Sequence, residues 1–259
     1  MKKLVSLLLI AVILFGAACK QSNEKKTESS TTEAKIPQHD PSKPDPKAFM
    51  PSNPAADSNS VTLFTRAATL IGLENYADGI KYINQYIAKY PDDANAYFVK
   101  GFAEDQAKDY KTAILDFTEA LRRNPDHTYA MMYKGHSHLY LDQYPEAFEL
   151  FTRVIKKEPK NMLAYYNRGL ALSKLNKYKE SVDDFTQALK IDSAYAPAYN
   201  NRGNAKYLAG DADGACKDWK NSIRLGNIAS EKAYKFYCEG DKAKKTAAPP
   251  LQPETKKKN

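Results

Sequence analysis

Residue types that carry out chemistry are scarce in this sequence. Among 259 residues there are one tryptophan, three cysteines and four histidines. The histidines stand neither in an HExxH spacing nor beside a CxxC pair. The sequence also lacks a glycine-rich phosphate loop, a GxSxG motif and a cysteine placed with a base. We therefore expect no enzyme activity, no cofactor, no bound metal and no small-molecule substrate.

Excess charge is absent from the middle of the chain. The formal net charge is +8, but Lys2 and Lys3 contribute two of these charges. Residues 242–259 hold six lysines and one glutamate, which adds five more. The remaining residues are nearly neutral, so no basic face is expected there and no nucleic-acid partner is predicted.

Only one long apolar run is present, at the amino terminus. Residues 4–15 are apolar apart from Ser6, follow two lysines and precede the small residues 16–18. This order is typical of a secretory signal peptide, which we place at 1–18. The run is too short for a membrane-spanning helix, which needs about 20 apolar residues.

The residue after this leader is Cys19, and the pattern resembles the lipobox of bacterial lipoproteins. That resemblance implies that Cys19 is acylated and holds the chain on a membrane. The match departs from the family at Gly16, where leucine is preferred, and the alternative is an ordinary secreted protein. Lys20 is not the aspartate that favours inner-membrane retention, which points to the outer membrane of a diderm bacterium.

Two segments are predicted to be disordered. Residues 19–59 are rich in Lys, Ser, Thr, Glu, Asn and Pro, and residues 242–259 are rich in Lys and Pro. Such compositions bury too little apolar surface to offset the entropy of ordering the chain. We interpret the first as a tether. The second is either a solubilising end or a contact for an anionic surface.

The region between them repeats every 34 residues. The eighth place of each row is small and the twenty-fourth is large and apolar. The members are Ala67, Gly101, Gly135, Gly169 and Gly203, and Ile83, Phe117, Phe151, Phe185 and Trp219. Apolar residues at three-and-four spacing predict two amphipathic helices in each row. One such pair cannot bury its apolar face alone, so the pairs must stack.

These columns resemble those of tetratricopeptide-repeat proteins. The resemblance implies an all-α fold, an α-solenoid of five helix-turn-helix repeats at 60–93, 94–127, 128–161, 162–195 and 196–229. The segment around residues 230–241 is predicted to be a further helix that caps the open end.

Two cysteines remain in the repeat region, Cys216 in the last row and Cys238 in the capping helix. An even pair in an exported protein favours a disulfide, and stacking would place the two helices side by side. Two free thiols are the alternative. The surrounding residues also resemble exported repeat proteins that carry cysteines at these two places.

A basic residue fills the seventh place of every row, and an aspartate fills the twenty-third place of three rows. Because the total charge is matched, we expect pairs between the two helices of a repeat. The alternative is a row of cations that binds an acidic ligand.

The resemblance also implies a binding groove lined by the first helix of each repeat, at its second, fifth, ninth, twelfth and thirteenth places. The residues carried over as partner-binding are Phe64, Phe98, Phe102, Tyr129, Met132, His136, Tyr140, Tyr166, Asn200, Asn204 and Tyr207. Exposed aromatic residues on a rigid surface suit an extended peptide or an amphipathic helix. The alternative is that some of them only fill the inner wall. The family's Lys and Asn clamp for a C-terminal carboxylate is absent.

The function expected from these patterns is a monomeric, lipid-anchored scaffold of the bacterial cell envelope that binds a partner protein or peptide in its groove. It would face the periplasm or the cell surface. Two alternatives are an accessory subunit of an envelope assembly or cell-wall machine, and an adhesin-like binder of host or matrix molecules.

Overall fold

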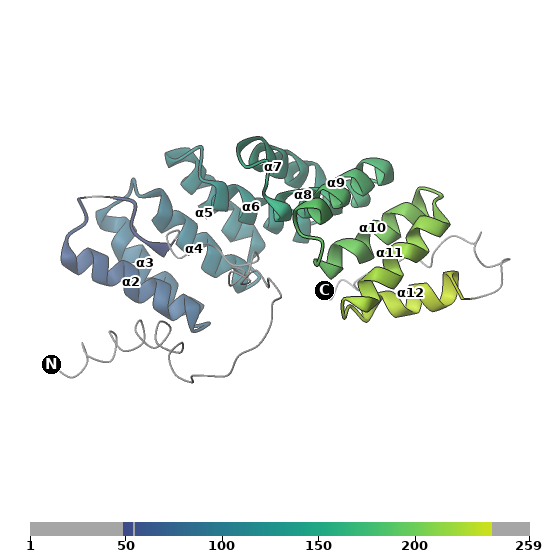
Figure 1. Cartoon of the computed structure of the whole chain (residues 1–259). Coiled ribbons are helices and arrows are strands. Elements are labelled where there is room, and N and C mark those ends of the chain that lie inside the picture. Colours follow the sequence, from purple (N-terminus) through teal and green to yellow (C-terminus); the bar gives the residue numbers. More distant parts are fainter. Residues whose placement is uncertain (1–48, 54, 240–259) are drawn as a thin grey trace, which may run out of the picture. The chain divides into compact units, whose positions relative to one another are not determined.

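The computed structural model describes residues 49–53 and 55–239, and its described helices pack one after another along the chain (Figure 1). They are α2 (Ser58–Gly72), α3 (Tyr76–Lys89), α4 (Ala94–Gln106), α5 (Tyr110–Arg123), α6 (Thr128–Tyr140), α7 (Tyr144–Lys157), α8 (Met162–Lys174), α9 (Tyr178–Ile191), α10 (Ala196–Leu208), α11 (Ala212–Arg224) and α12 (Ala229–Tyr237). No strand occurs among the described residues. The predicted all-α repeat fold is confirmed, with two helices in each row.

Several predictions concern residues outside the described ranges. The signal peptide at 1–18, Cys19, the tether up to residue 48 and the tail at 242–259 all lie there. In the part of the chain that is described, no helix has the length and apolar character needed to cross a bilayer.

The even-numbered helices form one layer of the array. Each packs on its neighbours in sequence, and α2, α4, α6, α8 and α10 also lie close to the next even-numbered helix. They are the first helices of the five repeats. We call the exposed side of α4, α6, α8 and α10 the inner face.

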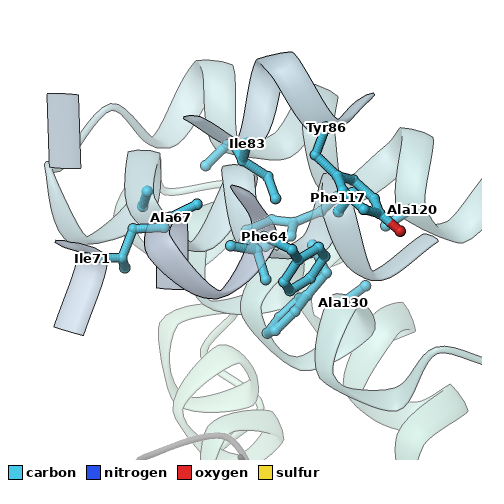
Figure 2. Packing of buried hydrophobic residues seen from close by; sticks show 13 residues of the cluster. Phe64, Ala67, Ile71, Ile83, Tyr86, Phe117, Ala120 and Ala130 are labelled. Atoms are coloured by element: carbon cyan, nitrogen blue, oxygen red, sulfur yellow. The ribbon is translucent and has the colours of Figure 1, made fainter. Parts of the chain in front are cut away.

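Glycine at the eighth place allows the two helices of a repeat to touch. A Cβ atom on Gly101 would lie 2.9 Å from the ring of Phe117, and one on Gly135 would lie 2.8 Å from that of Phe151. Real Cβ atoms do not approach so closely, so the aromatic column determines the glycine column. The core that these contacts build in the first repeats is shown in Figure 2.

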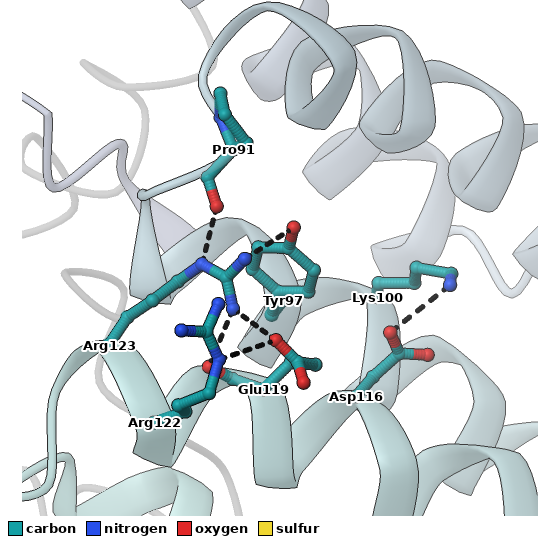
Figure 3. A network of polar contacts seen from close by, with 7 residues as sticks. All are labelled: Pro91, Tyr97, Lys100, Asp116, Glu119, Arg122 and Arg123. Atoms are coloured by element: carbon teal, nitrogen blue, oxygen red, sulfur yellow. Dashed lines mark hydrogen bonds and ion pairs between the residues drawn. The ribbon is translucent and has the colours of Figure 1, made fainter.

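Ion pairs connect the two helices of three repeats, as the charge columns predict. Arg168 donates two hydrogen bonds to Asp184, at 2.8 and 2.7 Å, and Arg202 binds Asp218 at the same distances. Lys100 lies 3.1 Å from Asp116 (Figure 3). These basic residues are therefore structural and do not form a free cationic row.

A further arginine connects neighbouring repeats. Arg123 near the end of α5 donates to the hydroxyl of Tyr97 at 2.8 Å and also to the backbone carbonyl of Pro91 (Figure 3). Its guanidinium lies over the Tyr97 ring, 3.8 Å from the centroid. The turn between the first two repeats is fixed by this one side chain.

The turn inside each repeat uses a left-handed residue. Glu74, Lys108, Asp142, Asn176 and Gly210 all have φ between 58° and 93° and stand 34 residues apart. Each follows the end of an even-numbered helix, where a left-handed residue lets the chain reverse. Only one of the five is glycine, so residue type alone does not mark this column.

Part of the predicted tether is ordered, which corrects the prediction of disorder over 19–59. Ser58 and Asn59 belong to α2, because Asp57 caps this helix by accepting a hydrogen bond from the backbone N–H of Ser60. Residues 49–53, which we call the leading segment, pack against α4. The composition of the tether concealed these few contact-forming residues.

The predicted cap of the last repeat is α12, and its disulfide is present. Cys216 of α11 and Cys238 at the end of α12 are joined, with Cα atoms 5.7 Å apart. The ring of Tyr237 lies on Trp219 and on Tyr207, at centroid distances of 5.8 and 4.5 Å. Helix α12 thereby covers the apolar end of the array.

Candidate functional site

Three of the predicted partner-binding residues belong to the core. Phe64 and Phe98 have no exposed surface, and Met132 is 8% exposed. A ligand on the inner face cannot reach the first two, so the prediction that they bind a partner is wrong, and Met132 offers almost no surface either.

Phe64 is buried because the first repeat carries a large residue at a place where others are small. Tyr86 stands 34 residues before Ala120, and its ring meets that of Phe64 edge-on at 5.0 Å. Figure 2 shows both side chains between their helices. The tyrosine fills the space that would otherwise leave Phe64 accessible.

Phe98 is buried because side chains from three directions cover it. The rings of Tyr129 and Tyr133 on α6 lie 6.2 and 5.9 Å away, and that of His127 lies 5.0 Å away. On the remaining side, Phe49 of the leading segment lies at 5.9 Å. Phe98 thus occupies the predicted groove place, but the groove is filled there.

The central part of the inner face carries exposed aromatic surface. Tyr140 is 58% exposed and stacks on Tyr110 at 4.6 Å, and the ring of His136 meets it edge-on at 4.7 Å. Behind them lies the buried carboxylate of Asp105, which accepts from the hydroxyl of Ser137 at 2.7 Å. His136 Nδ1 is 3.4 Å from the same carboxylate. These rings are held rigidly and can receive an apolar or aromatic side chain.

The carboxyl-terminal part of the inner face is polar and half-buried. Asn200 accepts from the hydroxyl of Ser230 at 2.8 Å, and Asn204 accepts from Trp219 Nε1 at 3.0 Å. Tyr166 is half-buried; its hydroxyl accepts from Asn201 at 2.9 Å. Burial raises the pKa of Tyr166 above its usual value, so this phenol stays neutral.

The other predicted residues on this face are half-buried aromatics. Phe102 and Tyr129 flank the site of Phe98, and Tyr207 packs on Tyr237 of the cap. The structure therefore divides the predicted set. Three members lie in the core, and eight reach the surface of the even-numbered helices.

A polar cluster at the start of α4 was missed by the sequence reasoning. The carboxylate of Asp93 is 2% exposed and caps α4, accepting from the backbone N–H of Asn95 at 2.9 Å. It also accepts from the hydroxyl of Tyr86 at 2.7 Å, and the pKa of this phenol is raised by burial and by the carboxylate. Asn95 stands at the second place of its row, a groove place, so the column rule already contained it.

His127 orients the Asn95 side chain. Its Nδ1 accepts from the backbone N–H of Ala130 at 3.2 Å, so the proton of the neutral ring is on Nε2. Nε2 then donates to the Asn95 amide oxygen, 3.0 Å away. The amide nitrogen of Asn95 consequently points to the other side, toward the leading segment.

This arrangement predicts a loss of stability in mild acid. Burial lowers the pKa of His127 to about 4, while the unfolded chain takes up the proton near pH 6.5. The contribution is complete above pH 6.5 and falls as the pH drops toward 4. We expect the chain to lose about 2 kcal/mol more between pH 7 and pH 5 than a His127→Asn chain does. Urea unfolding at the two pH values measures this. Equal losses in the two chains would refute it.

Within the described residues, no group of three or more His, Cys, Asp or Glu side chains is placed to hold a metal ion. The candidate site is therefore a surface of rings and amides.

Family comparison identifies the class of protein. Three models described as tetratricopeptide repeat match residues 64–128, 129–161 and 163–195, together just over half of the chain. The chain therefore belongs to the tetratricopeptide-repeat family, whose fold serves as a scaffold for protein interactions. No curated protein sequence matches it.

Solved structures share the fold. MamA from Desulfovibrio magneticus RS-1, residues 41 to the end, is 19% identical with a TM-score of 0.64, covering 66% of this chain and 97% of that one. YrrB, described as a tetratricopeptide-repeat protein with an unusual peptide-binding site, is 18% identical with a TM-score of 0.61, covering 68% and 92%. At such identities the likeness concerns the fold alone.

Proposed function

We propose that this chain is a lipid-anchored scaffold of the bacterial cell envelope that binds an extended segment of a partner protein on the inner face from α6 to α10. The observation that carries the proposal is the accessible pair of rings, His136 and Tyr140, which continues into the amides of Asn200 and Asn204. Aromatic rings supply contact area at low entropic cost, and amides suit peptide backbone.

Two further observations support a protein partner. YrrB, which has the same fold, is described as having a peptide-binding site. The ion pairs between the helices of three repeats use their cations internally, which disfavours an acidic polymer as ligand.

A photoreactive phenylalanine derivative at position 140 tests the face. Tyr140 is 58% exposed, so the substitution leaves the fold intact, and we expect a covalent product with a partner in cells. The matched control is position 115, because Leu115 on α5 is 66% exposed but lies off the inner face. Identical products from both positions, or none from position 140, would contradict the proposal. The identity of the captured protein separates an envelope assembly machine from a host or matrix ligand.

The anchor is tested by Cys19→Ala. Acyl chains contribute about 0.8 kcal/mol for each buried methylene, so two or three chains make release negligible. We expect the substituted chain to move from the membrane fraction to the soluble fraction. A chain with Cys216 and Cys238 both changed to alanine should stay on the membrane. Continued membrane association of the Cys19→Ala chain would refute lipidation.

A further inference from the structure

The leading segment lies on the inner face of α4 as a short peptide would. The ring of Phe49 meets that of Phe102 edge-on at 5.1 Å and lies 5.9 Å from that of Phe98. These two phenylalanines of α4 stand at the fifth and ninth places of their row, which are groove places. We call the pair the aromatic notch.

Backbone groups of the segment are recognised by two side chains. The Met50 carbonyl accepts from the Asn95 amide nitrogen at 2.7 Å. The backbone N–H groups of Ser52 and Asn53 donate to Asp93 Oδ2 at 2.9 and 3.1 Å, and the Ser52 hydroxyl donates to the other oxygen. Pro51, between them, has no N–H to satisfy.

The receptor side of this contact is assembled without the segment. Asp93 is held by Tyr86 and by its role as the cap of α4, and Asn95 is oriented by His127. These residues come from the first three repeats. Such preorganisation lowers the entropic cost of binding a peptide there.

The segment itself is held more loosely than the surface it covers. Met50 is 56% exposed, and Ser52 is also exposed, whereas Asp93 is 2% exposed. Because the segment is joined directly to α2, its effective concentration at the notch is on the order of millimolar, so weak contacts are enough to keep it bound.

We propose that the leading segment is an intramolecular ligand that closes the amino-terminal half of the inner face, and that the partner peptide which replaces it carries the same recognition features. Those features are an aromatic side chain, the carbonyl of the following residue, and a hydroxyl with two N–H groups three and four residues further on. The inference rests on the proposed function in treating the inner face as a peptide-binding surface.

A labelled peptide with the sequence of residues 47–55 tests the proposal on the purified mature chain. Two variants open the site by different means. Phe49→Ala removes the ring, and Ser52→Asp places a second carboxylate against the buried Asp93. The matched control is Ser58→Asp, which makes the same change of residue type at an exposed position of α2.

By fluorescence anisotropy, we expect both opened chains to bind the peptide about tenfold more tightly than the native and Ser58→Asp chains do. Adding Phe102→Ala to Phe49→Ala should reverse most of that gain, because the notch loses one wall. A peptide with alanine in place of its phenylalanine should bind at least about tenfold more weakly.

Three results would overturn the proposal: equal binding to opened and native chains, no binding to either opened chain at about 1 mM peptide, or failure of both opened chains to fold. Amide hydrogen exchange gives a check without substitution. Ser52 and Asn53 should exchange well before the amides of α4, and exchange in step with α4 would make the segment part of the core. Loss of this inference with retained crosslinking from position 140 would leave the proposed function standing, and the reverse outcome would remove only the latter.

Discussion

Replacing Phe98 with alanine is expected to lower the free energy of unfolding by about 4 kcal/mol. The ring has no exposed surface and contacts rings of α5, α6 and the leading segment, among them Phe117 at 6.0 Å and Tyr133 at 5.9 Å. Those helices close around it from different repeats, so a cavity there cannot collapse easily. Urea unfolding followed by circular dichroism measures the loss.

The matched control is Phe102→Ala, one helical turn further on. Phe102 is only half-buried, so its removal should cost about 1–2 kcal/mol. If both substitutions cost the same, Phe98 would be no more important to the core than a groove residue, and the assignment made from its burial would be wrong.

Reducing the disulfide between Cys216 and Cys238 is expected to undock α12 while leaving the other repeats folded. The bond closes a loop with a sequence separation of 22 residues, which contributes about 3 kcal/mol. Helix α12 is short and terminal, and in a repeat array each unit is stabilised mainly by its neighbours. The loss therefore stays local.

The single tryptophan of the chain reports this change. Trp219 is 2% exposed and lies against Tyr237 of α12, so undocking should expose the indole and shift its emission to longer wavelength. Far-ultraviolet circular dichroism should fall only slightly. A Cys19→Ser chain should respond in the same way, since that residue is no part of the bond. Unchanged emission after reduction, or unfolding of the whole array, would contradict this account.

The partly exposed aromatic residues illustrate how far column reasoning extends. It placed Phe102, His136 and Tyr140 on the correct helix face, because the first helix of each repeat presents the same places to the inner face. It failed for Phe64 and Phe98. Their burial depends on Tyr86 and on Phe49, which are a departure from the repeat and a residue outside it.

The polar cluster was missed for a related reason. Asp93 and Asn95 look like an ordinary helix start, and nothing in their spacing connects them with Ser52, about 40 residues earlier. The left-handed turn residues escaped notice too, because Lys108 and Asn176 share a backbone conformation but no side-chain type. A pattern of residue types records only what the side chains have in common.

The amino-acid sequence by itself determined the helical repeat of this protein. Contacts such as that between Gly101 and Phe117 lie within one repeat and recur in the following repeats, so their chemistry is written in the period. Only the tertiary structure decided which groove places stay open. That choice depends on where the non-repeating leading segment comes to lie, which is a contact between distant parts of the chain that leaves no periodic trace.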